Sequence, residues 1–277
     1  MSPLSRFSST VAAGGRNATA AAVTAAALLM SLTACAGDTD KESAGAPGTA
    51  STSTAPKGDL TVLAASSLTD VFKKAGAAYE REHPGTKLTF SFAGSQELVA
   101  QVRQGAPADV LVTADTKSMD KVKADTGTPA IIAKNRLVIA TAEGNPKKIG
   151  GLRDLAGSDL KVVLAAPEVP AGKYSDRILD AQKITVKPVS LEPNVRAVLS
   201  KVELGEADAG LVYKTDAESA SDKVDAVAIP DAQNAIAQYP AATLKESKHA
   251  EAAAAFVAWL STPEARKILQ EAGFQQP

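Results

Sequence analysis

Four short loops in this chain place a hydroxyl or a backbone amide at the start of a helix-like apolar pattern. Ser67 lies in the segment AASSLTD, Ser95 in FAGSQ, Ala171 in VPAG and Val195 in PNVR. The first N–H groups of a helix have no carbonyl partner, and the helix dipole adds partial positive charge there. Several helix starts aimed at one point form an anion site without Lys or Arg. The loops therefore predict binding of a small oxyanion rather than catalysis.

A fifth candidate, Tyr213, ends an apolar strand-like run. Open α/β sheets bind ligands beyond the carboxyl ends of their strands, and a buried phenol needs a hydrogen-bond partner. Each residue taken alone also has a plainer interpretation. Ser67 with Asp70 fits a capping box, Ser95 fits an ordinary helix cap, and Tyr213 fits a core position. The residues alone leave these alternatives open.

Apolar periodicity divides residues 59–277 into alternating strands and helices. The expected strands are 60–65, 87–92, 109–113, 137–142, 161–165, 185–189, 209–213 and 224–229. The expected helices are 68–79, 96–104, 117–124, 172–182, 195–204, 250–260 and 263–272. Alternating βα units predict a parallel sheet with helices on both faces.

Two comparable groups of βα units predict two α/β domains rather than one. The first domain is expected to combine residues 59–137 with 238–277, and the second to cover 138–237. The chain should then cross between the domains near Arg136–Leu137 and again near Gln238–Tyr239.

Composition argues against several classes of function. The chain has a net charge of -1, and residues after Cys35 carry 28 basic against 31 acidic groups, or -3, which disfavours nucleic acid as a partner. His83 and His249 are the two histidines, and both lie outside the four loops. The single cysteine excludes an intrachain disulfide and a cysteine metal site. We therefore expect no catalytic residue, no bound metal and no cofactor.

The N-terminal residues predict export. Residues 1–35 combine a basic start at Arg6 and Arg16 with a small apolar stretch that is short for a membrane span. The segment LTAC resembles the lipobox of bacterial lipoproteins, which implies cleavage before Cys35 and lipid on its thiol. The alternative is a plain signal peptide with a chance cysteine. Residues 36–58 lack apolar periodicity and predict a disordered tether.

Motifs spread over residues 59–277 are similar, in order, to those of the molybdate-binding receptors of ABC importers. The similarity runs through LTVLAASSLTD, FAGS, GAPAD, VPAGKY, NVR, GLVY, YP and the C-terminal GF. It implies a type II periplasmic-binding-protein fold, an α/β architecture with a hinged cleft between two domains. It implies that molybdate is held by Ser67, Ser95, Ala171, Val195 and Tyr213. The serines would donate by hydroxyl and backbone, Ala171 and Val195 by N–H, and Tyr213 by its phenol.

The same resemblance implies an extracytoplasmic receptor, lipid-anchored at Cys35, that delivers its ligand to an ABC transporter permease. The anion would bridge the two domains and favour closure, because only closure completes its set of donors. Tungstate is nearly isosteric with molybdate and is expected to bind too, and the protein is expected to be a monomer. Gly94 and Lys173 depart from residues common in the family, and the roles of Lys173 and Arg196 stay open.

Three other functions fit part of the sequence. A receptor of the same architecture for sulfate, thiosulfate or phosphate would use the same donors, although a lining of donors disfavours hydrogen phosphate and cavity size decides on sulfate. A serine hydrolase or transferase would use Ser67 or Ser95, but neither serine lies in a Gly-x-Ser-x-Gly segment. A structural surface lipoprotein would carry the same cleft without a ligand.

Overall fold

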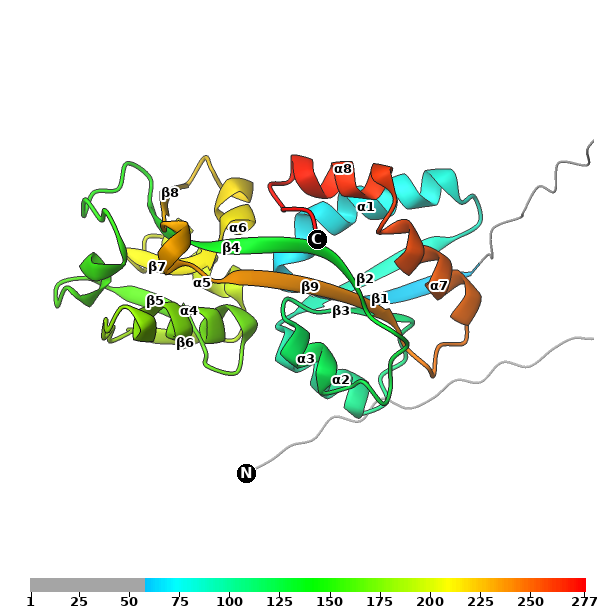
Figure 1. The fold of residues 1–277 in the computed structure, drawn as a ribbon. Coiled ribbons are helices and arrows are strands. Elements are labelled where there is room, and N and C mark those ends of the chain that lie inside the picture. The colour runs from blue at the N-terminus through cyan, green and yellow to red at the C-terminus, as the bar shows by residue number, and fades with distance from the viewer. Residues whose placement is uncertain (1–57) are drawn as a thin grey trace, which may run out of the picture. The chain divides into compact units, whose positions relative to one another are not determined.

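The computed structural model describes residues 58–277, which form two lobes joined by two long strands (Figure 1). The predicted signal segment 1–35, the lipidation residue Cys35 and all of the predicted tether except Gly58 lie outside the described residues. Among the helices that the structure describes, none is long and apolar enough to cross a membrane.

Lobe 1 is built on a mixed sheet with the strand order β2-β1-β3-β9-β4. Its strands are β1 (Asp59–Ala65), β2 (Lys87–Ala93), β3 (Val110–Val112), β9 (Ile236–Thr243) and the first part of β4 (Ala130–Ala142). Its helices are η1 (Ser66–Leu68), α1 (Thr69–Glu82), α2 (Ser95–Arg103), α3 (Thr116–Asp120), α7 (Ala250–Trp259) and α8 (Pro263–Glu271). β1 is parallel to β2 and β3, whereas β9 is antiparallel to β3 and β4.

Lobe 2 is built on the second part of β4, which lies between β7 and β8, and the sheet continues from β7 to β5 and β6. The other strands of the lobe are β5 (Val162–Ala165), β6 (Ser190–Glu192), β7 (Ala209–Tyr213) and β8 (Val224–Ala228). Its helices are η2 (Leu152–Ala156), α4 (Pro170–Ala181), α5 (Val195–Glu203), α6 (Lys214–Ser219) and η3 (Asp231–Gln233).

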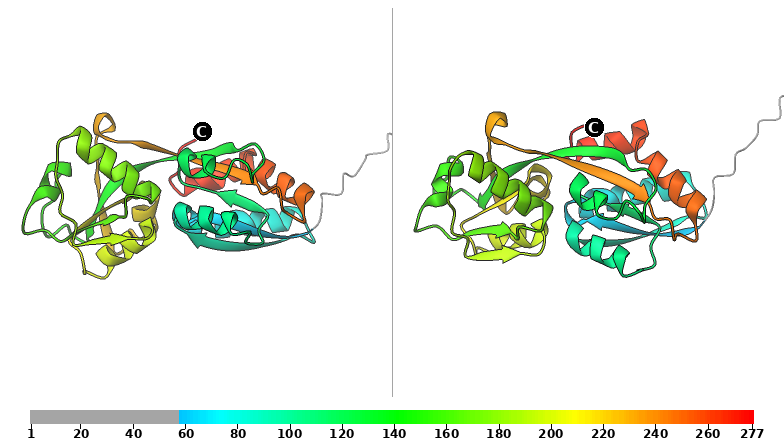
Figure 2. Two further views of the ribbon diagram at one scale, coloured as in Figure 1. Left: turned by 90° about the horizontal axis from the view of Figure 1, so that it is seen from below. Right: turned by 60° about the horizontal axis from the view of Figure 1, so that its bottom comes forward.

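The connection between the lobes consists of β4 and the segment that leads into β9 (Figure 2). β4 pairs with β9 up to Arg136, with β7 from Leu137 onward and with β8 from Val138 onward. Two extended segments therefore carry the chain from one lobe to the other. A hinge needs only a few residues that absorb a change in backbone angles, so two such crossings suit a hinge between the lobes.

The helix starts follow from local sequence signals. The Asn194 side chain caps α5 by accepting a hydrogen bond from the Ala197 N–H at 3.0 Å. α5 buries Val198 and Val202 with their apolar neighbours on one face, so the periodic pattern sets the side that packs on the sheet. α4 starts at Pro170, whose missing N–H costs nothing in the first helical turn.

The fold class agrees with the prediction, but four elements differ from it. β9 makes the lobe 1 sheet mixed, and its central Pro240 argued against a strand because proline cannot donate to a ladder. Residues 185–189 form no strand; Pro188 interrupts them, Val189 is 58% exposed, and pairing with β5 begins only at Ser190. The helix expected at 117–124 ends at Asp120, and α6 was not predicted.

Candidate functional site

The five residues expected to bind an anion line one small cavity, which receives walls from both lobes. Ser67 and Ser95 come from lobe 1, and Ala171, Val195 and Tyr213 come from lobe 2. All five are at most 3% exposed. The cavity volume is about 10 Å³, so the donors lie close together around a nearly filled centre. The structure thus brings together residues that lie far apart in the sequence.

Three helix N-termini and the η1 turn begin at this cavity. Ser95 is the first residue of α2, Val195 the first of α5, and Ala171 the second of α4. Ser67 lies in η1, which leads directly into α1. The first-turn N–H groups have no carbonyl partner within their own helices, so their partial positive charges meet at one point.

The hydrogen-bond partners of the two serine hydroxyls allow each to donate to a ligand. Ser95 Oγ accepts a hydrogen bond from the Ala114 N–H at 3.0 Å. Ser67 Oγ lies 2.9 Å from the Tyr239 hydroxyl, which can act as the donor of that pair. A serine hydroxyl has one proton and two acceptor sites. With their acceptor sites engaged, both serines can therefore donate into the cavity.

Tyr213 presents a hydroxyl that has no hydrogen-bond partner among residues 58–277, although the residue is only 1% exposed. Its ring packs edge-on against Tyr239, with the ring centroids 5.9 Å apart. Burial raises the pKa of the phenol well above its ordinary value, with smaller contributions from nearby tyrosines and carboxylates. The group is therefore a neutral donor, and a buried donor without a partner is uncommon in folded proteins.

Tyr239 contacts the site residue Ser67, and the sequence analysis did not single it out, although its Tyr-Pro motif belongs to the family resemblance. Burial raises the pKa of Tyr239, and hydrogen bonds with Ser67 and Asn135 oppose that rise. The Asn135 amide also donates to the Thr215 hydroxyl at 2.9 Å. Tyr239 thus fixes the orientation of Ser67. It lies on β9, a strand that was not predicted because it contains Pro240.

Two cations close in sequence to the candidate donors are paired with carboxylates. Lys173 Nζ lies 3.1 Å from Asp115 Oδ2, and this pair joins lobe 2 to lobe 1. Arg196 contacts both Asp70 and Asp216 at 2.7 Å. The residues that line the small cavity are all uncharged. A bound anion would therefore be stabilised by neutral donors and helix starts rather than by a salt bridge.

A third contact closes the lobes beside the cavity. The Gln96 side-chain amide, on α2, donates to the Pro193 carbonyl at 2.8 Å. A Cβ at position 94 would meet that same carbonyl at 2.6 Å and the Gln96 amide at 2.5 Å, so Gly94 permits the close approach. Walls from the two lobes thus meet at the cavity.

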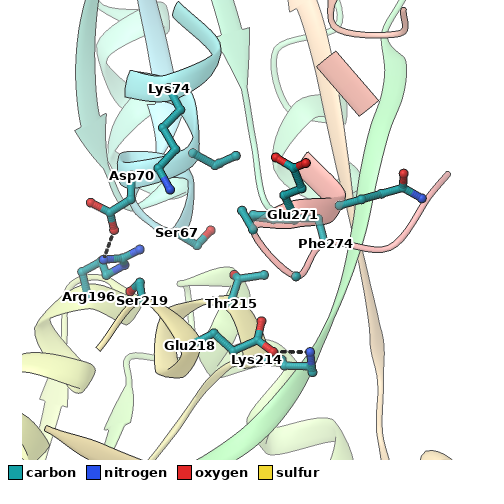
Figure 3. Close-up of a pocket in the computed structure, with 14 residues that line it drawn as sticks. Ser67, Asp70, Lys74, Arg196, Lys214, Thr215, Glu218, Ser219, Glu271 and Phe274 are labelled. Carbon is teal, nitrogen blue, oxygen red and sulfur yellow. Dashed lines mark hydrogen bonds and ion pairs between the residues drawn. The ribbon is translucent and has the colours of Figure 1, made fainter. Parts of the chain in front are cut away.

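A larger cavity of about 420 Å³ adjoins this side of the molecule (Figure 3). Ser67 lines both cavities. The larger one is bordered by α1, α6 and the C-terminal end of the chain, and its charged side chains carry both signs. Within residues 58–277, no group of His, Cys, Asp and Glu side chains is arranged to hold a metal ion. The candidate donors thus gather at the small cavity, whereas the larger cavity is lined by charged side chains of both signs.

Fold and cavity together define the class of protein: a two-lobed solute-binding protein that encloses a small polar ligand between its lobes. The chain belongs to the bacterial extracellular solute-binding protein family, whose sequence pattern matches residues 60–275.

Molybdate-binding protein ModA of Mycobacterium tuberculosis (strain ATCC 25618 / H37Rv) is 41% identical over 255 residues, which cover 91% of this chain and 95% of that protein. Two solved structures show the same fold. The Azotobacter vinelandii periplasmic molybdate-binding protein has a TM-score of 0.65 at 23% identity, with 79% of this chain and 99% of that chain covered. The sulfate-binding protein SubI from Mycobacterium tuberculosis has a TM-score of 0.71 at 21% identity, with 79% and 86% covered.

Proposed function

We propose that this protein is an extracytoplasmic receptor that captures molybdate, and also tungstate, and delivers it to the permease of an ABC importer. The single observation that carries the proposal is the convergence of four helix-start or turn residues and the unpartnered Tyr213 hydroxyl on one buried cavity. The 41% identity with a molybdate-binding protein over 91% of this chain supports the choice of ligand.

The donor set suits a fully ionised tetrahedral oxyanion. Such a dianion has four acceptor oxygens and no proton, and it meets hydroxyl and amide donors from Ser67, Ser95, Ala171, Val195 and Tyr213. Each hydrogen bond to a charged group contributes about 1.5–3 kcal/mol, and each helix terminus up to about 2 kcal/mol. Several such donors offset the desolvation of the anion and support binding at about micromolar Kd or tighter, or roughly -8 kcal/mol.

The same lining disfavours hydrogen phosphate, because its proton would face donors and find no acceptor. Sulfate, in contrast, has the charge and shape of molybdate and differs mainly in size. A sulfate or thiosulfate receptor is therefore the second candidate, and the fold likeness to a sulfate-binding protein is compatible with it. We infer no enzymatic role, since the described residues that line the cavity include no His, Cys, Lys or carboxylate to serve as a base.

Calorimetric titration of the full chain with molybdate, tungstate, sulfate and phosphate tests the proposal. We expect molybdate and tungstate to bind with similar Kd values, with sulfate and phosphate at least about a hundredfold weaker, a difference of roughly 2.8 kcal/mol. Tight sulfate binding would leave the assignment as an oxyanion receptor intact and overturn the assignment of molybdate as its ligand. No heat with any of the four oxyanions would overturn the receptor proposal.

We further propose that the mature chain begins at Cys35 and is held at the membrane by lipid on that thiol. Support comes from the LTAC segment and from the position of the single cysteine at its end. A monomer without a bound cofactor fits this role. Fractionation of cells that express the wild type and Cys35→Ala tests the anchor: the wild type should follow the membranes, and the variant should not. An equal distribution of both would overturn it.

A further inference from the structure

Arg196 connects three of the loops that carry the candidate donors. It follows Val195 directly at the start of α5, so its backbone belongs to the donor segment itself. Its Nε donates to Asp216 Oδ1 at 2.7 Å, and its Nη1 lies 2.7 Å from Asp70 Oδ2. The arginine side chain is 24% exposed, lines the larger cavity and spans from lobe 2 to lobe 1 (Figure 3).

The first arm of this contact leads to Tyr213. Asp216 is fully buried and uses its second carboxylate oxygen, Oδ2, to accept the Tyr213 N–H at 3.2 Å. The same carboxylate lies in the first turn of α6, directly after β7. Arg196 and the Tyr213 backbone therefore share one carboxylate, which fixes the end of β7 relative to the start of α5.

The second arm leads to Ser67. Asp70 lies in the first turn of α1, three residues after Ser67 of η1, and Figure 3 shows Asp70 in contact with Arg196. This contact forms between the lobes, so it exists only when the lobes are together. The Arg196–Asp70 contact thus stabilises the closed arrangement of the lobes and also fixes the position of the turn that contains Ser67.

The charge balance shows that Arg196 does not neutralise a bound anion. One guanidinium faces two carboxylates, so the three groups together carry a net charge of about -1 at neutral pH when both are ionised. Arg196 does not line the small cavity, whereas Val195 does. Its planar fork holds two carboxylates in a fixed relative position, a role that a lysine point charge cannot reproduce.

We propose that Arg196 is a positioning residue: with Asp216 and Asp70 it aligns the Val195, Tyr213 and Ser67 donors and retains the bound oxyanion by holding the lobes together. This inference rests on the proposed function, because the donors it aligns are those of the oxyanion site. It assigns no direct contact between Arg196 and the ligand.

The test compares the full-length wild type with Arg196→Lys, Asp70→Asn and a control, Lys201→Gln. Lys201 lies on the same helix and pairs with Glu206 at 2.8 Å on the surface, away from the cavity, so the control also removes one ion pair from α5. Sodium molybdate is titrated calorimetrically, and its dissociation rate is measured by displacement with tungstate. The melting temperature of each anion-free protein is recorded alongside.

We expect Arg196→Lys to raise the molybdate Kd at least about tenfold. Lysine cannot bind both carboxylates as the guanidinium does, and the loss of one hydrogen bond between charged groups changes an equilibrium constant by about this factor. Asp70→Asn should raise the Kd about threefold through faster dissociation with little change in the association rate, since its contact exists only after closure. Asp70 is 49% exposed, so this variant should fold normally. Lys201→Gln should bind like the wild type.

Wild-type affinity in Arg196→Lys would overturn the inference, because charge alone would then suffice. A lower melting temperature with an unchanged Kd and dissociation rate in both variants would also overturn it and leave Arg196 a purely structural residue. If the wild type itself binds no oxyanion, the proposed function fails and this inference fails with it. Binding by the wild type with unaltered variants removes only the inference.

Discussion

The Tyr213 hydroxyl combines two properties that seldom occur together: it is buried, and it has no partner among the described residues. Leaving a buried polar group unpaired costs about 1–3 kcal/mol of folding free energy. A protein that tolerates this cost at a cavity wall can recover it on binding. The Tyr213 hydroxyl therefore links the stability of the anion-free protein to its affinity for the anion.

Tyr213→Phe should separate these two effects. We expect the molybdate Kd to rise at least about tenfold, since a donor to a charged ligand is lost. The free energy of unfolding of the anion-free protein should stay the same or rise by up to about 1 kcal/mol, because an unpaired hydroxyl is removed. Calorimetric titration and denaturant unfolding measure the two quantities.

Tyr79→Phe is the matched control for this variant. The Tyr79 hydroxyl is also buried without a partner in the described chain, and the residue lies on α1 outside the small cavity. It should affect stability in the same direction and leave the Kd unchanged. Equal Kd values for both variants and the wild type would contradict a role for the Tyr213 hydroxyl in binding.

Asp216 gives the site a pH-dependent contribution to stability. Burial raises the pKa of its carboxyl to about 6, opposed by Arg196 and by the Tyr213 N–H, while Asp70 acts in the same direction as burial. The folded protein therefore holds this proton more tightly than the unfolded chain between about pH 4 and 6. In that window the contribution of Asp216 to the free energy of unfolding falls as the pH rises.

Asp216→Asn removes this titration and leaves the other carboxylates in place. We expect the melting temperature of the variant minus that of the wild type to increase between about pH 4 and pH 7, measured without anion in one buffer series. A difference that stays constant over this range would show that Asp216 titrates with its ordinary pKa. The comparison needs no absolute stability, because shared groups cancel.

At the element scale, the helix starts were the predictable part of the site. Asn194 before α5 and Pro170 at the start of α4 are local signals that Val195 and Ala171 follow directly, and Tyr213 ends a strand. Their meeting at one cavity was proposed from family resemblance, since nothing local dictates it. The contacts of Arg196 with Asp70 and of Lys173 with Asp115 join residues distant in sequence, so only the fold reveals them.

Gly172 shows how tightly one of these elements is placed. A Cβ at this position in α4 would lie 2.1 Å from the Ala166 carbonyl oxygen and 2.6 Å from that of Ala165, at the end of β5. Both contacts are with backbone, which cannot rotate away. The helix start that carries the Ala171 N–H thus approaches the strand end as closely as a glycine allows.

Gly172→Ala should therefore displace the start of α4. We expect a loss of about 1–3 kcal/mol in the free energy of unfolding, the range found for overpacked sites, and a weaker molybdate Kd because the Ala171 N–H moves with the helix. Gly150→Ala is the control, since the nearest atom to its added Cβ, Asp154 Oδ2, is 3.6 Å away. Unchanged stability and affinity in Gly172→Ala would contradict the close-approach argument.

At the scale of the described molecule, closure depends on contacts of two kinds. The ligand would bring the donors of both lobes together, and side chains outside the cavity hold the lobes directly. Lys173 and Asp115 form one such pair, with the Asp115 side chain 5% exposed and also accepting the Ser118 N–H at 2.7 Å. The strands β4 and β9 pair with each other along the connection between the lobes. A ligand shifts such an equilibrium only by its preference for the closed state.

Small-angle X-ray scattering of the chain with increasing molybdate follows this equilibrium. We expect the radius of gyration to fall as molybdate is added. In Lys173→Gln, half of that change should require about three to ten times more molybdate, because an ion pair specific to the closed state is lost while the donors remain. Lys201→Gln serves as the control and should follow the wild type. The end state should be the same in all three proteins, since the ligand contacts are intact. A radius of gyration that does not respond to molybdate in the wild type would show that the lobes stay together without a ligand, and the anion would then reach its cavity by another route.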